Sequence, residues 1–247
     1  MKASIFPAGD RALSLEFGQA IDPTINQSIQ RLVGSIENLH LEGLGELVPT
    51  YCSLLVYYDP MVRSYQDMVS LLESLLEQEV PVRSDDYVNL IEIPTLYGGD
   101  YGPDLDFVAT HAGLSTQEVV SIHSGRDYLV YMLGFMPGFT YLGGMDPRIA
   151  TPRLASPRTK IHAGSVGIAG QQTGTYPSDS PGGWQIIGRT PIAMYDSRQN
   201  CGALCKAGDY VRYVPIGEDE FIRIKELGLA YVPAQKRIKV GDLRGQS

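Results

Sequence analysis

The sequence has little cysteine and no long uninterrupted apolar segment. Three cysteines in 247 residues are too few for a disulfide scaffold, and such usage is typical of a reducing compartment. The longest charge-free stretch, residues 128–145, contains glycines and a proline and is shorter than the about 20 apolar residues of a membrane helix. The first residues include no apolar run of the length found in signal peptides. We therefore expect a cytoplasmic protein with no membrane partner.

Positive charge and nucleotide-binding motifs are also scarce. Lys and Arg number 20 against 28 Asp and Glu, and the net charge of −8 excludes a general basic surface for nucleic acid. The phosphate-binding pattern G-x-x-x-x-G-K-[ST] is absent from the sequence. Gly164, Gly167 and Gly170 do not have the spacing of the dinucleotide-binding fingerprint.

Motifs for metal binding and nucleophilic catalysis are missing as well. The four histidines form no H-E-x-x-H pattern, and no C-x-x-C pair is present, so we expect no metal site. The separation of Cys201 and Cys205 is not the redox spacing, and there is no G-x-S-x-G nucleophile elbow. His111 and His123 fall in predicted helices, and we interpret both as structural. The residues alone therefore identify no catalytic nucleophile or base.

The residues that are present divide into two halves, predicted as domains 1–82 and 83–247 with residues 81–86 as the linker. The first half is predicted to be a small α+β sandwich, ferredoxin-like, with its helices on one face of a sheet. Asp22-Pro23 favours a helix start, with Asp as the N-cap and Pro at the first helical position. The predicted strands are 3–7, 12–17 and 46–58, the helices 22–39 and 65–78, and a further strand at 87–93.

The second half is rich in glycine and proline and has many short strand-like runs, which are typical of a β-barrel or sandwich. Ser115 and Glu118 have the spacing of a capping box at the start of a helix. The predicted helices are 104–111, 115–123 and 218–227, and the predicted strands are 128–133, 165–169, 185–187, 192–195 and 210–214.

Residues 128–195 reverse the charge of the chain. Five basic residues and two acidic residues give this window a charge of +3, and three arginines follow prolines at five-residue intervals. Prolines so closely spaced indicate a stiff, turning loop that presents arginines, the residue best suited to bidentate capture of carboxylate or phosphate. The alternative interpretation is a rigid surface connection with scattered, solvated charges. The candidate anion-binding residues are Arg148, Arg153, Arg158 and Arg189.

The same window contains long runs that resemble one protein family. The segments are 133–144 (LGFMPGFTYLGG), 151–153, 157–159, 163–166, 168–170, 172–177, 180–184 and 187–190, and residues 7–13 are similar to the family's N-terminal signature. They resemble the KipI family, which is also called allophanate hydrolase subunit 1 and the 5-oxoprolinase B subunit (PxpB). The resemblance covers nearly the whole chain.

This resemblance implies a fold, an activity and partners. It implies an α+β N-terminal domain and a cyclophilin-like β-barrel C-terminal domain. It also implies that the chain is the B subunit of an ATP-dependent 5-oxoprolinase, which opens 5-oxo-L-proline to L-glutamate. The implied partners are a KipA-type (PxpC) subunit and a LamB/YcsF-type (PxpA) subunit. ATP is the implied cofactor, held mainly by a partner chain.

The candidate site follows from the residues and this resemblance together. The four arginines are candidate donors to a phosphate or to the substrate carboxylate, because a lactam ring opening driven by ATP develops negative charge. Gln172, Thr173 and Tyr176 are candidate hydrogen-bond partners of the substrate. Phe139, Tyr141 and Trp184 are expected to form an apolar wall. Because no nucleophile is identified, we expect the isolated chain to be inactive and a partner chain to complete the site.

Three alternatives remain open. The same scaffold occurs in the carboxyltransferase part of urea amidolyases, so a urea- or allophanate-type carboxyltransferase subunit is one of them. A KipI-like inhibitor of a sensor histidine kinase is another, and would use the exposed apolar residues Phe135, Met136 and Pro137. The third is prolyl isomerase activity, which rests on the implied fold alone.

Overall fold

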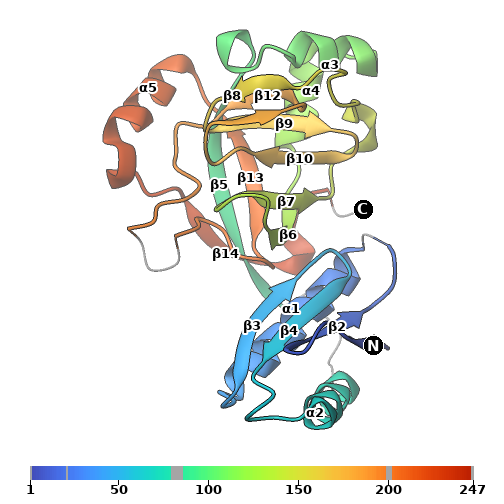
Figure 1. The fold of residues 1–247 in the computed structure, drawn as a ribbon. Helices are drawn as coiled ribbons and strands as arrows, with labels where there is room; N and C mark the ends of the chain where they lie inside the picture. The colour runs from blue at the N-terminus through green and yellow to red at the C-terminus, as the bar shows by residue number, and fades with distance from the viewer. Residues whose placement is uncertain (1, 21, 79–85, 199–201, 246–247) are drawn as a thin grey trace. The chain divides into compact units, whose positions relative to one another are not determined.

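The computed structural model describes residues 2–20, 22–78, 86–198 and 202–245 (Figure 1). The chain forms two compact units, residues 1–83 and residues 84–247. The predicted domain boundary at 82/83, and the predicted linker apart from Asp86, fall in residues 79–85, which lie outside the described residues. Each unit has its own buried apolar core and is described by itself.

The first unit is an antiparallel four-stranded sheet with two helices. Asp22 begins the first helix by accepting a hydrogen bond from the Thr24 backbone N–H at 2.6 Å, and Pro23 is its first residue. The strand order is β1-β2-β4-β3. The elements are β1 (Ser4–Pro7), β2 (Ala12–Glu16), α1 (Pro23–Asn38), β3 (Leu44–Pro49), β4 (Ser53–Tyr58) and α2 (Tyr65–Glu77).

The core of this unit lies on one face of its sheet. Leu13 and Leu15 of β2 stand opposite Val56 and Leu54 of β4, so the four side chains share a face. All four are fully buried. The apolar stripes of both helices belong to the same buried cluster, which places α1 and α2 on that face, as predicted. The stripes consist of Ile29, Leu32 and Ile36 in α1 and Met68, Leu72 and Leu76 in α2.

One strand prediction for this part of the chain is wrong, and one predicted strand exists but belongs to the other sheet. The strand predicted over 46–58 is the hairpin β3–β4, because Thr50 and Ser53 form a turn in which the Thr50 N–H donates to the Ser53 carbonyl at 2.8 Å. The strand predicted at 87–93 is the start of β5 (Tyr87–Tyr97), which pairs with strands of the second unit. A ferredoxin-like fold needs this last strand in the first sheet. The first unit has the order β-β-α-β-β-α without it, so its order is not ferredoxin-like.

The second unit is built around one sheet that nearly closes on itself. Its order is β10-β9-β12-β5-β13-β6-β7, with β14 also paired to β5, and the end strands β7 and β10 lie next to each other. Figure 1 shows β5 and β13 running side by side as parallel neighbours. The strands are β6 (Tyr128–Leu133), β7 (Thr140–Gly143), β9 (Ser165–Ala169), β10 (Gln172–Thr175), β12 (Gln185–Arg189), β13 (Tyr210–Pro215) and β14 (Gln235–Lys239), and a separate pair is β8 (Arg158–Ile161) with β11 (Ser180–Gly182).

Three helices cover this sheet, and all three were predicted. They are α3 (Leu105–Ala112), α4 (Thr116–Ser124) and α5 (Glu218–Leu227). Ser115 and Glu118 form the predicted capping box, with Ser115 Oγ accepting from the Glu118 N–H at 3.2 Å. Contacts join α3 to β12, α4 to β13 and α5 to β5. Residues 192–195 are not the predicted strand; Tyr195 makes only an isolated bridge with Ala203.

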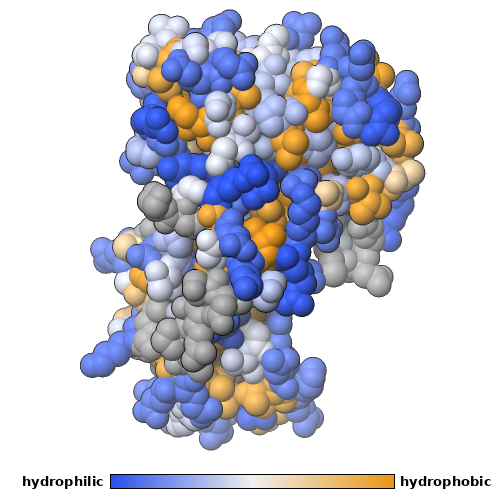
Figure 2. Space-filling model, turned by 180° about the vertical axis from the view of Figure 1, so that it is seen from behind, coloured by the Kyte–Doolittle hydropathy of each residue, from blue (hydrophilic) through white to orange (hydrophobic). Residues whose placement is uncertain are grey.

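The surface of the described residues is mixed in character. On the face drawn in Figure 2, hydrophobic residues form separate patches among hydrophilic ones. Among the helices of the described ranges, none combines the length and the apolar composition that crossing a bilayer requires. The main apolar core of the barrel includes Ile93, Val130 and Val211, and the candidate site is found on the outer face of the strands.

Candidate functional site

Two glycines create room on the outer face of the barrel. Val166 and Ile168 of β9 point into the main core, so Gly167 between them faces outward, opposite Gly174 of β10. A Cβ built on Gly174 would lie 3.3 Å from Cζ3 of Trp184, and one built on Gly167 would lie 3.3 Å from the Trp184 Cβ. The Trp184 side chain therefore packs directly on a strip without side chains. This contact explains why two of the glycines in residues 128–195 have no side chain.

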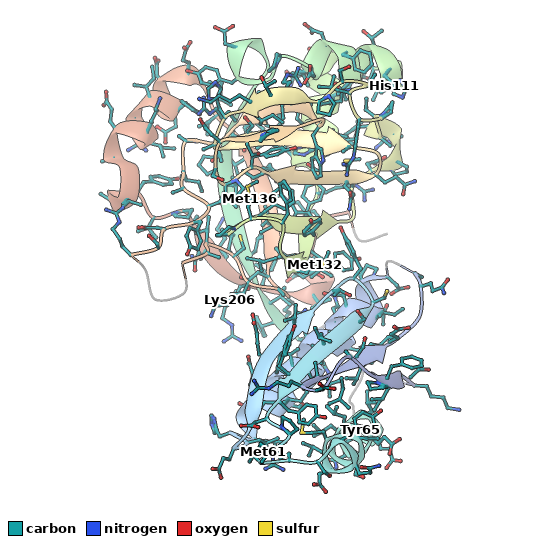
Figure 3. The ribbon with its side chains drawn as sticks, in the orientation of Figure 1. Met61, Tyr65, His111, Met132, Met136 and Lys206 are labelled. Atoms are coloured by element: carbon teal, nitrogen blue, oxygen red, sulfur yellow. The ribbon has the colours of Figure 1, made fainter. Side chains whose placement is uncertain are left out.

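Phe139 contacts both of the other residues that were predicted to form an apolar wall. The Phe139 ring centroid is 5.1 Å from that of Tyr141, 5.8 Å from that of Tyr176 and 5.8 Å from that of Trp184, all in edge-to-face geometry. Such aromatic pairs are worth about 0.5–1.5 kcal/mol beyond the area they bury. Met136, labelled in Figure 3, comes from the segment between β6 and β7 and packs against this group. We call Phe139, Tyr141, Tyr176 and Trp184 the aromatic cluster.

Arg153 lies over the aromatic cluster. Its guanidinium carbon is 5.9 Å from the centroid of the Trp184 ring, within cation–π range. Backbone hydrogen bonds fix the chain on either side of Arg153. The Gly170 N–H donates to the Thr151 carbonyl at 2.7 Å, and the Leu154 N–H donates to the Gly183 carbonyl at 2.7 Å. Within the described ranges no carboxylate lies in ion-pair distance of Arg153. Its charge is available to an anionic ligand.

Tyr176 supplies a neutral hydroxyl beside this cation. Burial raises the pKa of Tyr176 to about 12, and the nearby Arg153 charge opposes part of that rise. The hydroxyl is therefore protonated at neutral pH and can donate a hydrogen bond. A Cβ on Gly182 would lie 2.6 Å from the Tyr176 hydroxyl oxygen, so Gly182 leaves the space that this hydroxyl occupies.

Three buried polar atoms near the cluster have no hydrogen-bond partner within the described residues: Thr140 Oγ1, Ser180 Oγ and Gln185 Oε1. Thr140 directly follows Phe139, and Gln185 directly follows Trp184. Buried polar groups are normally paired, so these three atoms are unused hydrogen-bonding capacity. Thr140 alternates with Phe139 and Tyr141 and shares the inner face of Leu142, which belongs to the barrel core. No sequence pattern singled them out, because a lone Thr, Ser or Gln carries no motif.

Arg158 is paired with a carboxylate and supports the segment that carries Trp184. Its Nη2 donates to Asp104 Oδ1 at 2.7 Å, and its Nη1 donates to the Trp184 carbonyl at 3.3 Å. The other oxygen of Asp104 accepts from the Ile186 N–H at 2.6 Å. Asp104 and Arg158 are 54 residues apart, so the sequence did not show this pair. Its effect is to hold Trp184 in place.

Arg148 is also committed to a carboxylate. Its Nη2 donates to Asp146 Oδ2 at 2.8 Å, and Arg126 reaches the same oxygen at 3.3 Å. Lys160 pairs with Asp179 at 2.8 Å. The predicted positive window is thus largely neutralised in the folded chain. Arg153 is the arginine that the structure brings to the aromatic cluster.

The Asp146 ion pair makes a testable contribution to acid stability. The hydrogen bond from Arg148, helped by the charge of Arg126, lowers the pKa of Asp146 from 3.8 to about 2. A carboxyl whose pKa is lower in the folded state stabilises the protein above about pH 4 and loses that contribution as the pH falls toward about 2. As the pH falls from about 4 to about 2, the free energy of unfolding of Asp146→Asn should decrease less than that of the parent protein. Urea denaturation at a series of pH values measures both. Equal slopes for the two proteins would contradict this role.

Gln172 and Thr173 lie on opposite faces of β10. Gln172 is half-buried and shares the outer face with Gly174, beside the cluster. Thr173 points into the barrel, where its hydroxyl donates to the Gly167 carbonyl at 3.1 Å and contacts His123 Nε2 at 2.7 Å. The Thr173 hydroxyl has one hydrogen, which it donates to the Gly167 carbonyl. His123 Nε2 is therefore the donor in the bond between His123 and Thr173. This placement makes Thr173 part of the barrel interior, and its predicted contact with substrate stays untested.

His123 is the structural histidine that the sequence predicted. It is fully buried, its Nδ1 lies 2.8 Å from the Tyr97 hydroxyl, and burial lowers its pKa to about 3. With Nε2 carrying the proton, Nδ1 accepts from Tyr97. Both ring nitrogens are satisfied by a neutral imidazole. The described residues also include no group of three or more metal-ligating side chains.

Arg189 lies apart from the aromatic cluster. It ends β12, whereas Trp184 precedes that strand, so the two are separated by roughly 15 Å at about 3.3 Å per residue. Its Nε donates to the Ala163 carbonyl at 2.8 Å. The structure therefore assigns the four candidate arginines to four different surroundings.

The sequence matches an established family model. Residues 3–205 match the model described as "Carboxyltransferase domain, subdomain C and D". The chain belongs to this family. Every residue of the aromatic cluster, and Arg153, lies inside the matched region, whereas α5 and β14 follow it.

Curated relatives of this carboxyltransferase-domain chain are similar over most of their length. It is 45% identical to the 5-oxoprolinase B subunit of Bacillus subtilis over 88% of this chain and 95% of that protein. It is 37% identical to the 5-oxoprolinase B subunit of Escherichia coli O157:H7, over 87% and 96% respectively. These relatives confirm the family resemblance found in the sequence.

A solved structure shares the fold at low identity. The urea amidolyase of K. lactis superimposes with a TM-score of 0.75 at 21% identity, over 96% of this chain and 16% of that one. At this identity the likeness shows the fold alone. It supports a mixed α/β chain with a barrel-like sheet.

Proposed function

We propose that this chain is the B subunit of a 5-oxoprolinase and that the isolated chain is inactive. The observation that carries the proposal is the 45% identity to the 5-oxoprolinase B subunit of Bacillus subtilis across nearly the full length of both chains. The reaction is the ATP-dependent opening of 5-oxo-L-proline to L-glutamate. The fold and localisation proposed with it are a cyclophilin-like barrel and the cytoplasm.

The site offers groups that match this substrate class. 5-Oxoproline is a small ring with a carboxylate and a lactam amide. Arg153 would bind the carboxylate, since its guanidinium has no carboxylate partner within the described residues and its donors suit such a group. The ring would lie against Trp184. The Tyr176 hydroxyl, held neutral by burial, would donate to a ligand oxygen, and Gln172 stays a proposed contact on the same face.

The remaining chemistry is assigned to other chains. The described residues place no candidate nucleophile or base beside Arg153; the carboxylates of Asp104 and Asp146 are bound to Arg158 and Arg148. We therefore propose that a KipA-type (PxpC) and a LamB/YcsF-type (PxpA) subunit complete the active site. Because the sequence has no G-x-x-x-x-G-K-[ST] pattern, we propose that ATP binds mainly on a partner.

Two specific observations favour second candidates. The family description and the urea amidolyase fold favour a carboxyltransferase subunit acting on a urea-type substrate. Phe135 is 68% exposed with φ +64, an unusual conformation for an aromatic residue, and this exposed ring favours docking of a kinase or another protein. Both remain alternatives to the oxoprolinase proposal.

The test is an omission assay. The three subunits are mixed with ATP and 5-oxoproline, glutamate release is followed, and the assay is repeated without this chain. We expect release that stops when this chain is omitted. A stable three-subunit complex with no turnover would overturn the oxoprolinase proposal, and turnover of a urea-type substrate instead would establish the carboxyltransferase alternative.

Arg153 is tested in the same assembled complex. Arg153→Met removes the charge and keeps an apolar stem over Trp184, so we expect the KM for 5-oxoproline to rise about tenfold or more, the loss of one charge-assisted interaction of about 1.5–3 kcal/mol. The matched control is Arg237→Met, since Arg237 also stacks on an aromatic ring, that of Tyr87 at 5.6 Å. Equal KM values for the two variants would remove Arg153 from the site.

A further inference from the structure

A cationic pocket lies at the end of β12 that is far from Trp184. It is an open pocket of about 240 Å³, and its lining includes Arg189 and Lys225 together with Pro177, Ile192 and Phe221. The two cations come from separate elements, the end of β12 and the last turn of α5. None of the residues that line this pocket belongs to the aromatic cluster, and none of them is a contact used in the proposed function above.

The guanidinium of Arg189 is held in position by one hydrogen bond, and its two terminal nitrogens remain available as donors. Its Nε donates to the Ala163 carbonyl at 2.8 Å, which leaves the two terminal nitrogens without a hydrogen bond to any described residue. The wall beside it is closely built: Gly164 has φ +83, and a Cβ there would lie 2.3 Å from the Thr190 carbonyl oxygen. The Thr190 N–H also donates to the Gly164 carbonyl at 2.8 Å, which ties the two segments together.

Lys225 reaches the pocket from a helix anchored on the barrel. Phe221 and Ile224 of α5 are 2% and 1% exposed, so the helix is fixed by its apolar side. Over the described ranges, Lys225 and Arg189 both lack a carboxylate within ion-pair distance. This sets them apart from Arg158, Lys160 and Arg223, which are all paired.

The acidic groups around the pocket are either engaged or beyond ion-pair distance. Asp179 accepts from the Ala163 N–H at 2.8 Å and pairs with Lys160 at 2.8 Å. Glu220 is bound by Arg223, and Glu226, next to Lys225 in the chain, is exposed. Two uncompensated cations beside a small, rigid wall therefore attract an anion.

We propose that this pocket is a binding site for a phosphate-type oxyanion. Two positive charges from different elements match a dianion better than a single carboxylate. The donors of Arg189 and the ammonium of Lys225 provide the charge-assisted hydrogen bonds that a tetrahedral oxyanion accepts. The volume suits one phosphate group, either free or at the end of a larger molecule.

The test is calorimetric titration of the full chain with inorganic phosphate, and with acetate as the carboxylate probe. We expect one phosphate per chain and weaker binding of acetate. Arg189→Met and Lys225→Met are each expected to weaken phosphate binding about tenfold or more. Arg223→Met, on the same helix but paired with Glu220 and outside the pocket lining, is the matched control and should bind as the parent does.

A charge reversal guards against a folding artefact. Lys225 is exposed, so Lys225→Glu should keep the melting temperature and abolish phosphate binding. Failure of the parent chain to bind phosphate, equal affinity in the Lys225 variants and the control, or tighter binding of acetate than of phosphate would each overturn the proposal. Titration with ATP distinguishes a terminal phosphate from free phosphate as the source of the oxyanion.

Discussion

Replacing Asp127 with alanine is expected to lower the free energy of unfolding by about 3–5 kcal/mol, the usual cost of removing one partner of a buried ion pair. The Asp127 side chain is fully buried and binds Arg212 through two hydrogen bonds, Nε–Oδ1 at 2.6 Å and Nη2–Oδ2 at 2.8 Å. It also accepts from the Arg244 N–H at 2.9 Å. The substitution leaves the Arg212 charge in the protein, with Glu92 at 3.7 Å as its remaining partner.

The control for this experiment is an equally close ion pair on the surface. Arg223 and Glu220 form two hydrogen bonds at 2.6 and 2.7 Å, but both side chains are about half exposed. Solvent screens exposed ion pairs, so Glu220→Ala should be nearly neutral in urea denaturation. If the two alanine variants lost similar stability, burial would not be the source of the Asp127 effect.

The second large effect is expected at Trp184. Trp184→Ala should cost about 3–5 kcal/mol, because truncation of a buried aromatic side chain removes its transfer energy and leaves a cavity. Trp184 is 6% exposed, contacts Phe139 and Tyr176 edge-to-face, and rests on the glycine strip of β9 and β10. The same variant should also abolish the stacking surface for Arg153 and thus weaken substrate binding in the assembled complex.

The measurement for Trp184 is guanidinium denaturation followed by circular dichroism, since Trp184 is the sole tryptophan and its loss removes the fluorescence signal. Trp184→Phe keeps an aromatic ring and should lose less stability than Trp184→Ala. A cost below about 1 kcal/mol for Trp184→Ala would mean that the cluster does not depend on this ring.

Helices were predictable because their signals are local. Asp22-Pro23 and Ser115 stand at helix starts where a side-chain oxygen satisfies a backbone N–H, and the apolar stripes follow within a few residues. The strands were less predictable. Residues 46–58 read as one extended run, but a turn at Thr50–Ser53 folds them into a hairpin. The sequence of β5 is compatible with a strand in either unit. Only its pairing with β12, β13 and β14 assigns it to the second unit.

Part of the site was also visible in the sequence. Phe139, Tyr141 and Trp184 were predicted to form an apolar wall, and Tyr176 was predicted to bind substrate. The structure brings the four rings into contact, and their role in a binding site stays a prediction. The roles of the arginines were not visible, because an arginine beside a proline looks the same whether or not a carboxylate meets it in the fold. Asp104 meets Arg158 from 54 residues away, and the alternation of β10 turns Thr173 inward and Gln172 outward.

By itself the sequence determined the helices, the family, the acidic balance of the chain and the residues of the aromatic cluster, because these depend on local pattern and residue type. The tertiary structure decided which charges remain free. Asp146, Asp104 and Asp179 neutralise Arg148, Arg158 and Lys160, whereas Arg153 and Arg189 keep their charge within the described residues. Ion pairing depends on distances of a few ångströms between atoms from different elements, and only the packed sheet and helices set those distances.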